Sequence, residues 1–82
     1  MTDEELKRRF DVVGVEHEQQ DPRDNHHFTV RSTRTLLRAE AIEIQERHFG
    51  YPQMGYDFMY FGVKGEKDGV FTHTWSCAHS CE

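Results

Sequence analysis

Alternating apolar and polar positions predict four strands and one principal helix, in the order strand, strand, helix, strand, strand. The strands are expected at residues 11–18, 28–31, 56–64 and 70–78, which are rich in valine, threonine and aromatic residues. Turn-forming residues separate the two strands of each pair, so each pair is expected to form a hairpin. The pattern predicts a single small α+β domain over residues 1–82, with a four-stranded, mainly antiparallel sheet and one main helix packed on one face.

The main helix is expected at residues 36–49, where apolar groups recur at helical spacing. Its stripe consists of Leu37, Ala41, Ile44 and His48. Gly50 suits the left-handed position after a helix, and Pro52 prevents the helix from continuing. The start lies between Ser32 and Ala39, because the threonines of this segment suit either a strand end or a helix cap.

A short N-terminal helix is expected at residues 1–10. Thr2 and Glu5 have capping-box spacing, and Leu6 and Phe10 lie one turn apart on a common face. In the strand that follows, alternation places Val13, Val15 and His17 on one face and Val12, Gly14 and Glu16 on the other.

The last hairpin permits two registers, which differ in the side chains that face the helix. A tight turn at Asp68-Gly69 sets Tyr60 opposite Cys77, whereas a five-residue loop at residues 65–69 shifts every pairing. The longer loop is favoured, because it gathers large apolar groups on the helix side: Met59, Phe61, Val63, Phe71 and Trp75.

The favoured register leaves Tyr56, Phe58 and Tyr60 in a row on the opposite face of the sheet. One helix cannot cover both faces, and tyrosine is enriched at protein interfaces, so this row is the main candidate for partner binding. The alternative is that the N-terminal helix folds over the row through Leu6 and Phe10.

Charge and composition narrow the choice of partner. Ten basic and fifteen acidic side chains give a net charge of −5, which argues against direct binding to nucleic acid and is compatible with a basic protein partner. An apolar share of 35% builds a thin core, which a homodimer would reinforce. Residues 1–20 lack an apolar signal-peptide region, and no stretch is long and apolar enough to span a membrane, so a cytoplasmic location is expected.

The C-terminal segment gathers side chains that zinc prefers. In an extended strand His73, Cys77, His79 and Cys81 point one way, and Cys77, His79 and Cys81 are the candidate ligands of a small zinc-binding module. The alternative is an ordinary outer strand that ends in a solvated terminus. A Cys77–Cys81 disulfide requires a turn between the two residues, and a reducing cytosol favours the thiols.

Acidic residues recur along the main helix. Glu40 and Glu43 are the candidate acidic contacts to a protein partner, beside the aromatic row. An acidic DNA mimic is the alternative, with candidate residues at 3–5, at Glu16, Glu18 and Asp21, and at Glu40, Glu43 and Glu46. The helix set also reads as a solvated face, because Arg38 and Arg47 interrupt it. The chain has neither a defensible nucleophile–base arrangement nor a glycine-rich phosphate loop, so an enzyme is not expected.

Several features together resemble small phage-encoded anti-defence proteins, including anti-CRISPR inhibitors. They are the acidic balance, the Thr33-Arg34-Thr35 lead into a short helix, the Gly50-Tyr51-Pro52 break followed by Gly55-Tyr56, and the closing Trp75-Ser76-Cys77 segment. The resemblance implies a stoichiometric inhibitor or adaptor in the host cytoplasm, which occludes a surface of a host nuclease or nucleoprotein complex without catalysis. Such inhibitors share no common site, so the resemblance assigns no residues.

Overall fold

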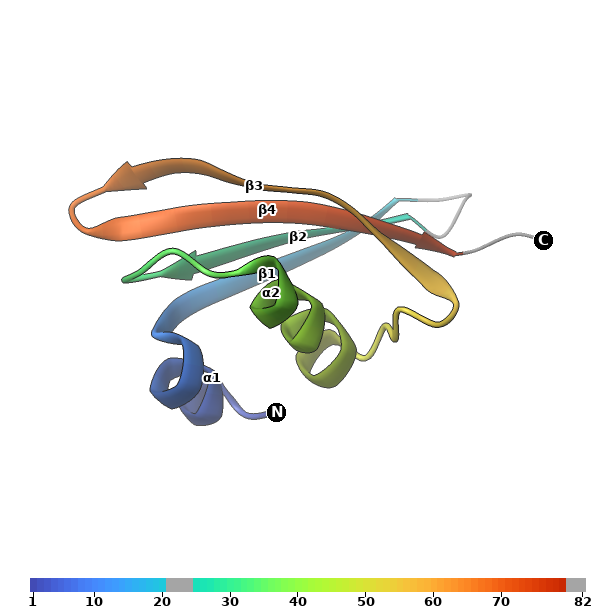
Figure 1. Ribbon diagram of the computed structural model, residues 1–82, viewed down its shortest axis with the longest axis horizontal. Helices are drawn as coiled ribbons and strands as arrows, with labels where there is room; N and C mark the ends of the chain where they lie inside the picture. The colour runs from blue at the N-terminus through green and yellow to red at the C-terminus, as the bar shows by residue number, and fades with distance from the viewer. Residues whose placement is uncertain (21–24, 80–82) are drawn as a thin grey trace.

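The computed structural model describes residues 1–20 and 25–79, and it confirms the predicted α+β fold. Its elements are α1 (Asp3–Phe10), β1 (Val12–Gln20), β2 (Asn25–Ser32), α2 (Arg38–Ile44), the π-helical segment η1 (Gln45–Phe49), β3 (Tyr56–Lys67) and β4 (Val70–His79). The four strands form an antiparallel sheet in the order β1-β2-β4-β3. Figure 1 shows both helices on the same side of this sheet, which we call the covered face; the other side is the open face.

The N-terminal helix forms as predicted. The Thr2 hydroxyl accepts a hydrogen bond from the Glu5 amide at 3.2 Å, which satisfies one of the amides that the first turn leaves without a partner. Leu6 and Phe10 are buried, and they join the core on the covered face. The N-terminal helix therefore lies beside the main helix and does not fold over the open face.

The central strands separate the two faces by simple alternation. On β2 every second side chain is buried, beginning at His26, whereas the intervening side chains reach solvent. The buried core of the described residues consists of Leu6, Phe10, Val12, Phe28, Val30, Leu36, Ala41, Ile44, Phe58, Trp75 and Cys77.

The predicted faces of the first strand need one correction. The pairing of β1 with β2 shifts between Val12 and Gly14, so Val12 and not Val13 shares a face with Val15; Val12 is 5% exposed and Val13 is 54% exposed. Beyond this bulge the alternation holds, and His17 lies opposite the buried Phe28 on the covered face.

The main helix begins later than the apolar stripe suggests. Leu37 is the N-cap residue and is 69% exposed, while its neighbour Leu36 is 4% exposed and takes the core position. Ala41 and Ile44 are buried as predicted, and Gly50 ends the helical segment in the left-handed region at φ 84°. Among the described residues, no helix has both the length and the apolar character that crossing a membrane requires.

The favoured register of the last hairpin is wrong. Lys67 pairs with Val70 around a tight Asp68-Gly69 turn. The tight register does not continue along the strands, because β3 shifts twice, once between Val63 and Gly65 and again between Met59 and Gly62. The far end of the hairpin consequently matches neither expected register.

Candidate protein-binding face

The open face carries short polar side chains on its two central strands. Directly opposite residues of an antiparallel pair share a face. Thr29 pairs with Thr74, and His27 pairs with Ser76, which places these four side chains on the open face because their strand neighbours Phe28 and Trp75 are buried. Such a face is compatible with water and leaves room for a partner above it.

Tyr60 rises from this face at the edge strand β3. It lies in the second register shift of that strand, its φ is 60°, and it is 84% exposed. The left-handed region is costly for an aromatic residue, by about 1–2 kcal/mol. The other non-glycine residues with positive φ among those described are Asp11, after a helix, and Asp68, in a hairpin turn, where aspartate is common.

Two shallow hollows lie at the foot of the Tyr60 side chain. The smaller has a volume of about 250 Å³, and the larger, of about 470 Å³, extends toward Lys64 and Thr74. His27, Tyr60 and Ser76 border both hollows. We call the combined surface the Tyr60 groove; it comprises His27, Met59, Tyr60, Lys64, Thr74 and Ser76.

The predicted aromatic row does not exist as a row. Phe58 is 9% exposed and packs against Phe61 and Trp75, with ring centroids 5.8 and 5.9 Å away. Tyr56 also packs against the core, so only Tyr60 projects from the open face. The physical reason is the second register shift, which adds a residue to β3 and places Phe58 opposite the buried Cys77.

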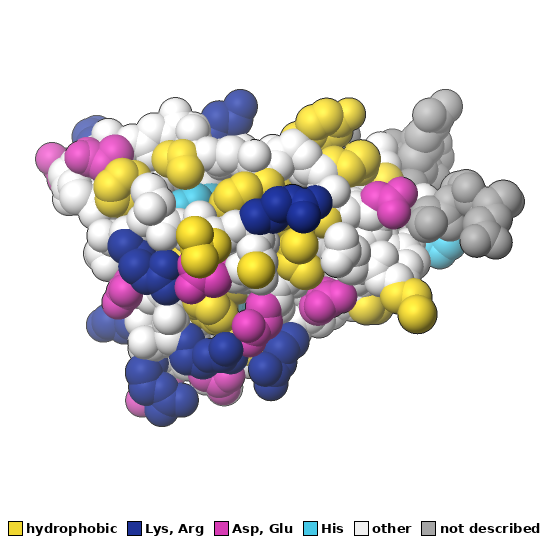
Figure 2. Space-filling model, viewed as in Figure 1, with side chains coloured by type: hydrophobic (Ala, Val, Ile, Leu, Met, Phe, Trp, Pro, Cys, Tyr) yellow, Lys and Arg dark blue, Asp and Glu magenta, His cyan; other side chains and the backbone are white. Residues whose placement is uncertain are grey.

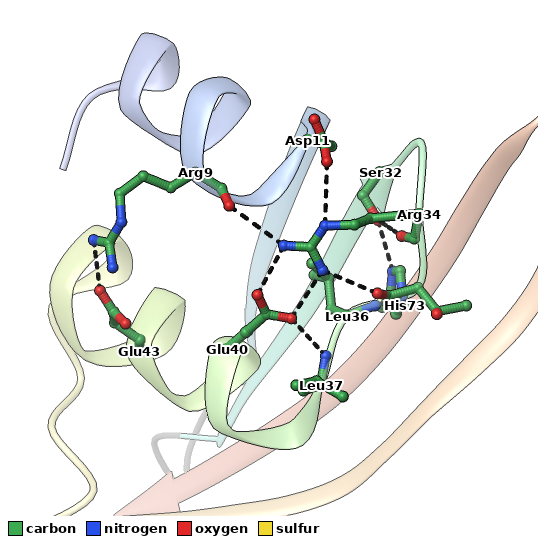
Figure 3. A network of polar contacts seen from close by, with 10 residues as sticks. Arg9, Asp11, Ser32, Arg34, Leu36, Leu37, Glu40, Glu43 and His73 are labelled. Carbon is green, nitrogen blue, oxygen red and sulfur yellow. Dashed lines mark hydrogen bonds and ion pairs between the residues drawn. The ribbon is translucent and has the colours of Figure 1, made fainter.

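Glu40, a predicted partner-binding residue, accepts hydrogen bonds from other residues of this chain (Figure 3). The Arg34 guanidinium donates to both of its carboxylate oxygens, at 2.8 and 3.0 Å, and the Leu37 amide donates to it at 2.8 Å. Arg34 also binds the carboxylate of Asp11 at 3.1 Å, so it joins α1, α2 and the segment before α2. The hydrogen bonds from Arg34 outweigh partial burial and lower the pKa of Glu40.

Glu43, the other predicted acidic contact, is also paired. Its carboxylate lies 2.7 Å from Arg9 and 3.3 Å from Arg47. In the same view as Figure 1, Figure 2 shows Lys and Arg intermingled with Asp and Glu around the two helices. Glu40 and Glu43 therefore lie on the side of the sheet away from Tyr60, within mixed charge, and DNA mimicry stays a prediction.

His73 is a core residue, although the tail pattern groups it with candidate metal ligands. It is 0% exposed; its Nε2 accepts from the Leu36 amide at 2.9 Å, and its Nδ1 lies 3.2 Å from the Val30 carbonyl. These partners fix the neutral form with the proton on Nδ1. Burial lowers the pKa of His73, the charge of Arg34 lowers it further, and the Val30 hydrogen bond opposes both.

Two further histidines form a pair at the other end of the sheet. His17 Nε2 and His26 Nδ1 are 2.8 Å apart, and both rings contact Tyr51. One nitrogen must donate and the other accept, so the pair cannot keep this contact with a proton on both. Partial burial, and secondly the neighbouring His26, lower the pKa of His17.

The predicted zinc ligands are only partly described. Cys77 is 0% exposed and lies opposite His26 in the sheet, whereas His79 is exposed at the end of β4. Cys81 lies outside the described residues, so the expectation that Cys77 and Cys81 are thiols stays a prediction. Within residues 1–20 and 25–79, no group of three or more His, Cys, Asp or Glu side chains is placed to hold a metal ion. Zinc binding by the tail stays a prediction.

Sequence reasoning missed most of the Tyr60 groove. His27 and Thr29 alternate with the apolar Phe28 and Val30, so their outward orientation could have been inferred from the sequence. Met59 and Lys64 could not, because they lie at the shifted positions of β3. Comparison of the chain with protein-family models, with curated proteins and with solved structures found no match.

Proposed function

We propose that this protein is a non-catalytic inhibitor or adaptor that binds another protein through the Tyr60 groove. The function is the one expected from the sequence, including occlusion of a host nuclease or nucleoprotein complex. The binding surface is the Tyr60 groove in place of the predicted aromatic row. The observation that carries it is the conformation of Tyr60, whose ring is 84% exposed on a left-handed backbone. An unfavourable conformation that displays a large aromatic ring contributes nothing to the core, and backbone strain of this kind gathers at functional sites.

The surroundings of Tyr60 suit an interface anchor. Tyrosine supplies a large contact area with little conformational entropy to lose, and residues of this type dominate the binding energy of many interfaces. Thr74 and Ser76 beside it are short and leave space for a side chain of the partner, and the partly exposed Thr74 offers a hydroxyl group for hydrogen bonding.

Tyr60→Gly tests the proposal, because glycine tolerates the left-handed backbone while the ring is lost. Immobilised wild type and variant are incubated with a lysate of the native host, and retained proteins are quantified by mass spectrometry. We expect Tyr60→Gly to retain at least about tenfold less of the partner than wild type does, because the loss of an anchor weakens the free energy of binding by about 2 kcal/mol or more. Lys67→Ala, a change at an exposed position near the hairpin turn, serves as the control and should retain the partner.

Two results would contradict the proposal. Equal retention by Tyr60→Gly and wild type would remove Tyr60 from the interface. The second is inhibition that increases over time until less than one equivalent of this protein has inactivated all of the target. Each copy would then act on several target molecules, which indicates turnover and not occlusion.

A further inference from the structure

The two edges of the sheet differ in how well they could accept another strand. Both β1 and β3 are edge strands, and an edge presents backbone amides and carbonyls without a partner strand. β3 is interrupted by two register shifts and the left-handed Tyr60, which protect an edge from pairing. β1 has one shift at its start and then pairs in unbroken register with β2 from Gly14 to Gln20. The edge of β1 is therefore the better template.

Two hollows lie along β1, one beside α1 and one on the open face. The first, of about 390 Å³, is lined by Asp3, Leu6 and Lys7 of α1 and by the consecutive residues 12–15. The second, of about 540 Å³, is lined by the consecutive residues 16–18 with His27 and Thr29. The second hollow lies on the open face, because Glu16 and Glu18 share that face with His27 and Thr29, and it touches His17 between them.

The side chains along this edge alternate in character. On the covered face, Val15 lies near Leu6 of α1 in the first hollow, so that face is apolar at this end of the strand. On the open face, Glu16 and Glu18 lie opposite Thr29 and His27. Residues directly opposite in neighbouring strands share a face, so an added strand would place one set of side chains against Glu16 and Glu18 and the alternate set against Val15 and His17.

We infer that the edge of β1, over residues 14–18, docks an extended segment of a partner protein in which basic and apolar side chains alternate. Backbone hydrogen bonds to β1 would hold the segment, as in other cases of strand addition, and its side chains would select it. The basic residues face Glu16 and Glu18, and the apolar residues enter the hollow beside Leu6 and Val15. This site goes beyond the Tyr60 groove, with which it shares His27, and it does not involve Tyr60 itself.

Charge disfavours those pairings of β1 with a second copy of the chain that bring its glutamates together. A two-fold pairing of β1 centred on Glu16 sets that residue opposite its own copy, and one centred on His17 sets Glu16 opposite Glu18. Like charges directly opposite in a sheet are destabilising. Glu16 has an exposed contact to Arg31 at 3.3 Å, which neutralises this charge only weakly in water.

A synthetic peptide of alternating lysine and valine, KVKVKVK, tests the inference on the full chain. Binding is followed by amide chemical shifts in ¹⁵N-labelled protein, and we expect the shifts to concentrate on residues 14–18. The reordered peptide KKKVVVK has the same charge and composition, and should bind at least about tenfold more weakly because its side chains no longer match both faces. Replacement of the central valines by proline should also abolish binding, because the ladder loses its donors.

Charge reversal on the protein gives the matched comparison. Glu16→Lys with Glu18→Lys should weaken binding of KVKVKVK at least about tenfold, whereas Asp57→Lys with Glu66→Lys, the same change in charge on β3, should not. The inference is overturned by equal binding to both double variants, by shifts confined to the Tyr60 groove, or by no shifts at about 1 mM peptide. A dimer in light scattering, with the same β1 amides perturbed in the absence of peptide, would make a second copy the occupant.

Discussion

The covered and open faces of the same sheet use polar side chains in different ways. On the covered face, polar groups are enclosed and tied to neighbouring segments: Trp75 donates to Gln45 at 3.1 Å, and the Leu36 amide donates to His73 at 2.9 Å. Among the described residues, no buried side-chain nitrogen or oxygen lacks a hydrogen-bond partner. On the open face, Tyr60 projects into solvent from a strained backbone. The covered face therefore uses its polar groups to stabilise the fold, whereas the open face leaves Tyr60 exposed.

Gln45 illustrates how closely the covered face is joined. Its side chain is 0% exposed, accepts from Trp75 of β4 and donates to the Tyr51 carbonyl at 3.0 Å. One amide side chain thereby connects the main helix, the segment that follows it and the sheet. A thin core gains from such links, because each buried polar group that is satisfied avoids a desolvation penalty.

The largest expected effect comes from truncating the covered face at Phe58. Phe58→Ala removes a ring that packs against Phe61 and Trp75, and should lower the free energy of unfolding by about 3–5 kcal/mol. That loss approaches the whole stability of a small domain. Urea denaturation followed by tryptophan fluorescence measures it. A loss below about 1 kcal/mol would show that Phe58 is not a core residue, and would contradict the distinction between the two faces.

A smaller effect is expected from acidification between pH 7.5 and 5.5. The pKa values of His17 and His73 are lowered in the folded protein, so the unfolded chain binds protons first. The free energy of unfolding should therefore fall as pH drops below about 6.5, by at most about 1.4 kcal/mol per pH unit for the buried His73 and by less for the exposed His17, which water screens. The measurement is urea denaturation at a series of pH values. His73→Gln should give a shallower slope, and an unchanged slope would show that His73 accepts a proton without loss of its contacts.

Local signals predicted much of the fold. The cap at Thr2, the left-handed Gly50 and the alternation of β2 each depend on a few neighbouring residues, and each was confirmed. The burial of His73 could also have been predicted, because it lies two residues from Trp75 and therefore on the same face of the strand.

The candidate site was less predictable, because it depends on register. A bulge adds one residue to one strand and reverses the faces beyond it, and β3 is so rich in aromatic residues that either orientation offers a plausible core. A similar difficulty applies to Leu36 and Leu37, because the sequence alone does not show which of two adjacent leucines faces the core. Side-chain pairs between distant segments, such as Arg34 with Glu40, depend on packing that alternation does not encode.

The free energy of unfolding of Tyr60→Gly tests the division between the two faces most directly. Relief of the left-handed backbone should leave the variant as stable as wild type or more stable by about 1 kcal/mol, because the exposed ring contributes no core packing. A loss of about 2 kcal/mol or more in the same urea titration would show that the Tyr60 ring supports the fold, and would contradict its role as a surface held ready for a partner.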